Sequence, residues 1–141
     1  MPRIAIVGAG LIGRSWANVF ARGGWDVGLY DPIVGQARNA LPLIVAGLRD
    51  LAEKGLIKDA DAAAARVTVA NTLEEALSGA IFVQENAPEK VEDKLALFAD
   101  LDRLAAPDAI LASSTSAIVA SRFTEALAGR SRTCPMLAIT V

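Results

Sequence analysis

The chemistry-bearing feature nearest the start of the chain is a glycine pattern. Gly8-Ala9-Gly10-Leu11-Ile12-Gly13 matches Gly-x-Gly-x-x-Gly and lies between an apolar run at 4–7 and a segment with helical spacing. In such a pattern Gly8 permits a tight turn, Gly10 lets a pyrophosphate approach the backbone, and Gly13 lets a helix pack closely on a strand. Glycines alone often only make turns, but the free N–H groups at the start of a helix favour phosphate. In this context the pattern predicts dinucleotide binding.

A single acidic residue follows at the spacing that such a site requires. Asp31 ends the second apolar run, 18 residues after Gly13. An acid there hydrogen-bonds the adenosine ribose, and its charge repels a 2′-phosphate, so NAD is favoured over NADP. Asp31-Pro32 alone is equally well explained as a plain turn. Together with the glycines it indicates a dinucleotide site.

Two polar segments, 84–88 and 113–116, each follow a predicted strand. Ligands of open α/β sheets bind outside the carboxyl ends of the strands, so we expect both segments in the site. The alternative for 113–116 is a helix N-cap and a polar loop. Glu85 and Glu89 would equally suit a helix start, where the helix dipole favours acids.

The elements that must position these residues alternate along the chain. The predicted strands are 4–7, 27–30, 67–69, 81–83 and 109–112, with a sixth expected at 136–141. The predicted helices are 11–22, 37–54, 60–65, 72–77, 89–105 and 117–127. Alternation from end to end predicts one α/β domain over residues 1–141, a doubly wound and mainly parallel Rossmann sheet with helices on both faces.

Local signals refine three of the helices. Gly23-Gly24 ends the first. Pro42 is expected to start or kink the second. Thr72 and Glu75 form a Thr-x-x-Glu capping box that opens the fourth. The helix at 89–105 is strongly amphipathic, and its predicted apolar face is Val91, Leu95, Phe98, Leu101 and Leu104.

Composition narrows the classes of function. The 141 residues suit one compact domain, and a net charge of −2 without a basic patch argues against a nucleic-acid partner. No run approaches the roughly 20 apolar residues of a membrane span, so we expect no membrane partner and a cytoplasmic location. One cysteine, Cys134, excludes an internal disulfide. The chain has no histidine, which excludes His-based catalytic triads, a histidine general base and His-ligated metals from these residues, and we expect no metal.

Three segments together carry a family resemblance. They are IVGAGLIGRSWANVFARGGWDVGLYDP at 6–32, QENAPEKVEDK at 84–94 and SSTS at 113–116. On these residues the sequence resembles the N-terminal NAD-binding domain of the L-3-hydroxyacyl-CoA dehydrogenase superfamily, in its lambda-crystallin and L-gulonate 3-dehydrogenase branch. The resemblance covers roughly residues 2–132.

The resemblance implies roles for individual residues. It places Leu11 and Ile12 in the pyrophosphate loop and Ser116 at the substrate oxygen near the nicotinamide. It places Glu89 and Lys94 near the nicotinamide-side ribose. The implied cofactor-binding residues are Gly8, Gly10, Leu11, Ile12, Gly13, Asp31, Glu89, Lys94 and Ser116, of which Ser116 is also catalytic. Lys54 is a weaker candidate for contact with a CoA phosphate.

The implied activity is oxidation of a 3-hydroxy group to a 3-oxo group by hydride transfer to NAD. The substrate would be a small molecule, either a 3-hydroxyacyl-CoA of fatty acid metabolism or a 3-hydroxy sugar acid. The family continues into a strand with His-Pro-x-Asn-Pro, whose histidine is the general base, and then into a helical domain. Residues 133–141 read TCPMLAITV instead. We therefore expect the base and the helical domain to be absent, and the chain to bind NADH without appreciable turnover.

Three further expectations remain open. Loss of the helical domain would expose apolar surface and favour a homodimer or another self-association. A stand-alone NAD(H)-binding module with a sensing or structural role is the alternative to an oxidoreductase. An FAD or S-adenosylmethionine site is a third alternative, which the match at Glu89, Lys94 and Ser116 disfavours.

Overall fold

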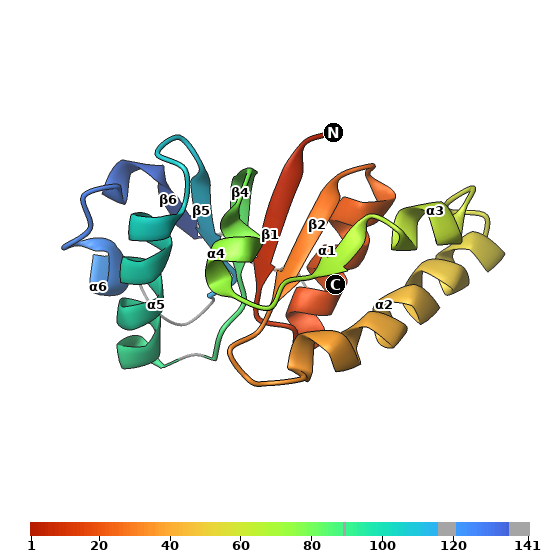
Figure 1. The fold of residues 1–141 in the computed structure, drawn as a ribbon, viewed down its shortest axis with the longest axis horizontal. Helices are drawn as coiled ribbons and strands as arrows, with labels where there is room; N and C mark the ends of the chain where they lie inside the picture. The colour runs from red at the N-terminus through yellow and green to blue at the C-terminus, as the bar shows by residue number, and fades with distance from the viewer. Residues whose placement is uncertain (89, 116–120, 136–141) are drawn as a thin grey trace.

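A computed structural model describes residues 1–88, 90–115 and 121–135. It contains a six-stranded sheet with the order β3-β2-β1-β4-β5-β6 (Figure 1). The strands are β1 (Arg3–Val7), β2 (Asp26–Tyr30), β3 (Val67–Val69), β4 (Ala80–Glu85), β5 (Ile110–Ser113) and β6 (Thr133–Pro135). Every pair of neighbouring strands is parallel. The doubly wound Rossmann prediction is confirmed.

Helices cover both faces of this sheet. They are α1 (Leu11–Arg22), α2 (Gln36–Glu53), α3 (Ala60–Ala64), α4 (Leu73–Leu77), α5 (Val91–Leu104) and α6 (Ser121–Thr124), with a 3₁₀ turn at Arg130–Arg132. The first three helices lie on one face and the last three on the other (Figure 1). No helix within the described ranges is long and apolar enough to cross a membrane.

The central strand β1 is buried on both sides. Ile4 and Ile6 pack into the core beneath α1 and α2, whereas Ala5 and Val7 pack into the core beneath α4 and α5. All four side chains are fully buried. The unbroken apolar run in the sequence therefore arises because each face of the strand is covered, as in other parallel sheets.

The order of the strands creates the crevice where a ligand can bind. β2 and β3 lie on one side of β1, and β4, β5 and β6 lie on the other. The chain therefore leaves the carboxyl ends of β1 and β4 toward opposite faces of the sheet, to α1 and to α5. This point, where the order of the strands reverses, is the topological switch point at which open α/β sheets bind their ligands.

The predicted helix at 89–105 needs two corrections. It begins at Val91 and ends at Leu104. Leu95, predicted on the apolar face, is 44% exposed, whereas Lys94 is buried beside Phe98 and Leu101. The helix turns Lys94 inward because the lysine amine pairs with a carboxylate at the end of β4.

Two local predictions were partly wrong. Pro42 does not start α2, which begins at Gln36 and continues past the proline. The proline lies on the exposed side of the helix, where it removes only one backbone donor. Thr72 caps α4 by accepting a hydrogen bond from the Glu75 N–H at 3.1 Å, but the Glu75 carboxylate accepts from the Asn71 N–H rather than from Thr72. Only half of the capping box therefore forms.

The end of the chain also differs from the prediction. Of the helix predicted at 117–127, residues 117–120 lie outside the described part, and α6 ends at Thr124. The strand predicted at 136–141 lies wholly outside it. A sixth strand forms three residues earlier, at Thr133–Pro135, and pairs in parallel with β5.

Candidate functional site

The glycine loop joins β1 to α1 and fits tightly against the loop after β4. Gly8 has a φ of +99°, in the left-handed region that favours glycine, and its N–H donates to the Tyr30 carbonyl at 2.8 Å. A Cβ atom on Gly8 would lie 2.9 Å from the carbonyl carbon and oxygen of Asn86. Glycine is required at this position by both the backbone conformation and the contact.

The other two glycines differ in what surrounds them. A Cβ atom on Gly13 would overlap the carbonyl oxygen of Gly8, so its absence lets α1 pack against the loop. A Cβ atom on Gly10 would have no neighbouring atom within 4 Å. Gly10 is the N-cap of α1, no side chain caps the helix, and its first turn has no acid. The open space and the uncapped N–H groups fit a pyrophosphate.

Asp31 lies just after β2, and its carboxylate bridges two loops. One oxygen, Oδ2, accepts a hydrogen bond from the Ala9 N–H at 2.8 Å, and Oδ1 accepts from the Ile33 N–H at 2.9 Å. These bonds fix the carboxylate beside the glycine loop. This is the position in which an acid receives the adenosine ribose hydroxyls.

A cleft of about 590 Å³ opens at this edge of the sheet. It lies between the loops after β1, β2 and β4, with α5 on the far side. The polar and glycine residues along it include Gly8, Gly10, Asp31, Gln36, Asn86 and Asp93. A smaller cavity of about 290 Å³ shares Tyr30, Asp31, Pro32 and Ile33 with the cleft and extends to Asn71 beyond β3. Together the two cavities leave space for an elongated ligand on both sides of Asp31.

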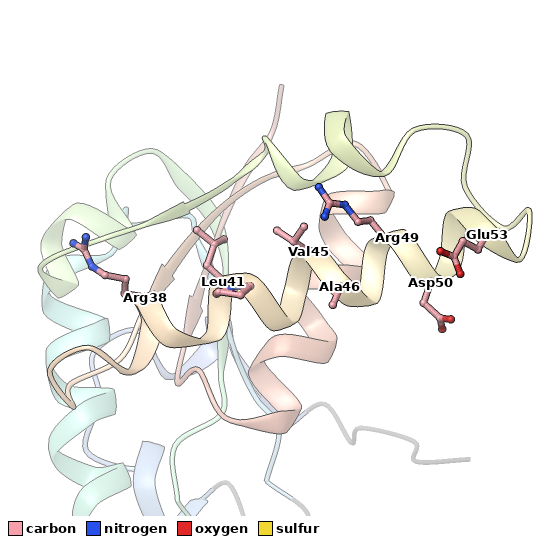
Figure 2. Close-up of a pocket in the computed structure, with 8 residues that line it drawn as sticks. Arg38, Leu41, Val45, Ala46, Arg49, Asp50 and Glu53 are labelled. Atoms are coloured by element: carbon pink, nitrogen blue, oxygen red, sulfur yellow. The ribbon is translucent and has the colours of Figure 1, made fainter.

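A separate groove of about 720 Å³ runs along the outer side of α2 (Figure 2). Its lining residues, from Arg38 to Glu53, all belong to this one helix. Among the described residues, no strand end, glycine loop or second element contributes a polar group to it. The cleft at the carboxyl edge is therefore the candidate site, although the groove on α2 has the larger volume.

A buried carboxylate organises the part of the edge beyond β4. Glu85 is the last residue of β4 and is fully buried. Its Oε1 accepts hydrogen bonds from Lys94 Nζ at 2.8 Å and from the Ala87 N–H at 2.7 Å. Its Oε2 accepts from Ser113 Oγ at 2.5 Å and from Lys94 Nζ at 3.1 Å. Glu85 thus joins β4, α5 and the end of β5.

A second polar network lies on the other face of β4 and centres on Ser114. The Ser114 hydroxyl accepts hydrogen bonds from Trp16 Nε1 at 3.2 Å and from Gln84 Nε2 at 2.7 Å. It donates to Asn86 Oδ1 at 2.5 Å. The network ties α1, which begins at the glycine loop, to the loops after β4 and β5.

The structure brings most of the predicted site to one edge. The three glycines, Asp31 and the segments 84–88 and 113–115 all lie at the carboxyl ends of the strands. Leu11 and Ile12 form the first turn of α1, where Leu11 is 69% exposed. Lys54 is not brought to the cleft, because it follows the far end of α2 and pairs there with Asp50 at 2.7 Å.

Three predicted roles remain predictions. Glu89 and Ser116 lie outside the described residues. Lys94 is described, but its side chain is only 1% exposed and its amine lies against Glu85. Its contact with the nicotinamide-side ribose is not tested by this arrangement.

Sequence reasoning missed the roles of Glu85 and Trp16. Glu85 was assigned either to the ligand segment or to a helix start, whereas β4 extends far enough to place it in the sheet. A signal was present: Lys94 falls in the apolar stripe formed by Val91, Phe98 and Leu101. A lysine at such a position needs a buried acid as its partner. Trp16 gave no comparable signal.

Comparison with known proteins agrees with this geometry. Residues 3–137 match the family described as 3-hydroxyacyl-CoA dehydrogenase, NAD binding domain. A lambda-crystallin homolog from Rattus norvegicus is 40% identical over 128 residues, which cover 89% of this chain and 40% of that protein. An L-carnitine dehydrogenase from Streptomyces griseus is 44% identical over 114 residues, or 81% of this chain and 33% of that protein.

A solved structure shows the same likeness. The crystal structure of 3-hydroxybutyryl-CoA dehydrogenase from Escherichia coli K12 superposes with a TM-score of 0.89 at 28% identity, over 96% of this chain and 29% of that one. The present chain thus spans less than half the length of these relatives. With 135 of its 141 residues matched, it belongs to the 3-hydroxyacyl-CoA dehydrogenase family, of which it is the NAD-binding domain.

Proposed function

We propose that this chain is the cofactor-binding part of a dehydrogenase that oxidises a 3-hydroxy group to a 3-oxo group. The observation that carries the proposal is the glycine loop, with its open Gly10, next to the fixed carboxylate of Asp31. Bound NAD supplies the hydride acceptor, and the protein supplies binding and orientation.

Different segments of the chain would bind different parts of the cofactor. The uncapped N-terminus of α1 binds the pyrophosphate, and Asp31 accepts the adenosine ribose hydroxyls and disfavours a 2′-phosphate. The loops after β4 and β5 hold the nicotinamide half on the other side of the switch in strand order. In this proposal Glu89 and Lys94 lie near that ribose, and Ser116 hydrogen-bonds the substrate oxygen.

The substrate class follows from the chemistry shared by the named relatives. L-carnitine and 3-hydroxybutyryl-CoA both carry a hydroxyl group on carbon 3. We infer a 3-hydroxy acid, free or as its CoA ester, with the ester placing the enzyme in fatty acid metabolism. A general base must accept the hydroxyl proton as the hydride leaves. None of the 141 residues is a histidine, so a histidine base would have to come from outside them.

A fusion tests this proposal. Residues 1–132 are joined in frame to the part of the Streptomyces L-carnitine dehydrogenase that follows its matching region. We expect NADH to form when L-carnitine and NAD are added, measured at 340 nm. A folded fusion that binds NADH but oxidises neither L-carnitine nor 3-hydroxybutyryl-CoA would contradict a dehydrogenase role. It would favour the alternative, a non-catalytic NAD(H)-binding module, which the lack of histidine also suits.

A further inference from the structure

We propose that Glu85 is a positioning residue for the nicotinamide half of the cofactor. It would act by holding the loops after β4 and β5 in one fixed arrangement. The inference rests on the proposed division of the cofactor across the switch in strand order. It assigns to Glu85 a role separate from those of the glycine loop and Asp31.

The first argument is that one carboxylate restrains both loops. Oε1 holds the loop after β4 through the Ala87 N–H at 2.7 Å. Oε2 holds the end of β5 through Ser113 Oγ at 2.5 Å, and this hydroxyl in turn accepts from the Thr115 N–H at 3.2 Å. The restraint therefore reaches the residue immediately before Ser116.

The second argument concerns the cost of burying these charges. The side chains of Glu85 and Lys94 are 0% and 1% exposed. Removing both charges from water is costly, and buried ion pairs can often be replaced by apolar residues without loss of stability. Stability alone therefore does not account for this pair. What an apolar pair could not do is hold two loop segments through directed hydrogen bonds, as Glu85 does with the Ala87 N–H and Ser113 Oγ.

The third argument is that the adenosine half is held independently. Asp31 accepts hydrogen bonds from the Ala9 and Ile33 N–H groups, whereas the described donors to Glu85 are Ala87, Lys94 and Ser113. The glycine loop does touch the loop after β4, since Gly8 packs against the Asn86 carbonyl and the Ala87 N–H. The Asn86 N–H, however, is fixed without Glu85, because it donates to the Val7 carbonyl at 2.8 Å. Loss of the Glu85 charge should therefore disturb the nicotinamide half of the site more than the adenosine half, which keeps the bonds of Asp31.

This asymmetry defines the experiment. Dissociation constants for NADH and for ADP-ribose, which lacks the nicotinamide, are measured on the full chain and on Glu85→Gln. Glutamine keeps the shape of the side chain but removes the negative charge that Lys94, the Ala87 N–H and Ser113 bind. We expect NADH binding to weaken roughly tenfold and ADP-ribose binding to change by less than about twofold, because the contacts of Asp31 do not include Glu85. Equal weakening of both ligands, or no change in either, overturns the positioning role.

A matched control lies at the other end of α5. Asp102, like Glu85, pairs with a basic residue, Arg132, at 3.1 Å and accepts a hydrogen bond from a loop N–H, that of Gly129. Asp102→Asn should lower stability while leaving the ratio of the two dissociation constants unchanged. A shift of that ratio as large as in Glu85→Gln would mean that the ratio reports loss of stability, and this would overturn the inference.

A milder variant covers the case in which Glu85→Gln does not fold. Ser113→Ala removes one of the bonds to Glu85 and leaves the ion pair intact. We expect the same selective loss of NADH affinity, smaller in size, and equal loss of both ligands again overturns the inference. If the unaltered chain binds ADP-ribose but not NADH, the proposed placement of the nicotinamide is itself wrong. That outcome is distinct from failure of Glu85 as the positioning residue.

Discussion

At the scale of single residues, substitutions of Gly10 and Gly13 should affect NADH binding and protein stability to different degrees. Gly10→Ala places a methyl group in open space, so the free energy of unfolding should change by less than about 1 kcal/mol. The same methyl group obstructs the pyrophosphate, and NADH affinity should fall roughly tenfold or more.

Gly13→Ala should behave in the opposite way. Its methyl group meets the Gly8 carbonyl in the free protein, and overpacking of this kind costs about 1–3 kcal/mol of stability. Urea denaturation and NADH titration of both variants check the contrast. Equal effects of the two substitutions on both measurements would refute this account of the loop.

Asp31 carries the predicted preference for NAD over NADP. Asp31→Ala should weaken NADH binding about tenfold to a hundredfold, because it removes charge-assisted hydrogen bonds to the ribose. The substitution should also reduce the difference in affinity between NADH and NADPH, since it removes the charge that repels the 2′-phosphate of NADPH. The matched control is Asp26→Ala, on the opposite end of β2, where the acid pairs with Arg66 at 3.2 Å. If Asp26→Ala weakens NADH equally, the loss is not specific to the ribose position.

At the scale of elements, α2 contains a proline, Pro42, whose replacement should stabilise the protein. Pro42 has no N–H to donate to the Arg38 carbonyl, yet the helix continues through it and the ring is exposed. Pro42→Ala restores the donor and should raise the free energy of unfolding by about 1–3 kcal/mol. Leu43→Ala, at a neighbouring position that is 53% exposed, should change it by less than about 0.5 kcal/mol. Chemical denaturation of both variants checks this, and a destabilised Pro42→Ala protein would contradict it.

Elements with strong periodicity could be predicted from sequence, and elements defined by distant contacts could not. The helix at 11–22 and the strand at 67–69 match the structure residue for residue, because glycines flank the helix and three β-branched residues form the strand. The strand predicted at 81–83 extends to Glu85, since parallel pairing with β1 and β5 continues through polar residues that local patterns do not mark. Lys94 faces inward for a similar reason, as its partner is nine residues away in sequence and in another element.

At the scale of the whole molecule, the site residues that follow a local sequence pattern could be predicted, and those that depend on distant contacts could not. The glycine loop and Asp31 follow a local pattern, and the structure places both at one cleft. The networks centred on Glu85 and Ser114 join residues up to 98 positions apart, so only the tertiary structure reveals them. The strand order is what makes them possible, because it sets β1, β4 and β5 side by side.

The whole chain should bind its cofactor without completing the reaction. Oxidation of a hydroxyl group requires a proton acceptor, and the 141 residues contain no histidine. We expect no NADH formation above background when the chain is given NAD with L-carnitine or 3-hydroxybutyryl-CoA, measured at 340 nm. Steady turnover that rises with chain concentration would show that another residue serves as the base.

The most direct test of the account is a calorimetric titration of the folded chain with NADH. We predict one NADH bound per chain, competition by ADP-ribose, and NADPH binding at least about tenfold weaker, because the charge of Asp31 repels the 2′-phosphate. A chain that shows a folded α/β circular dichroism spectrum but binds no NADH at millimolar concentration would contradict the assignment of the cleft. Tighter binding of NADPH than of NADH would contradict the role of Asp31.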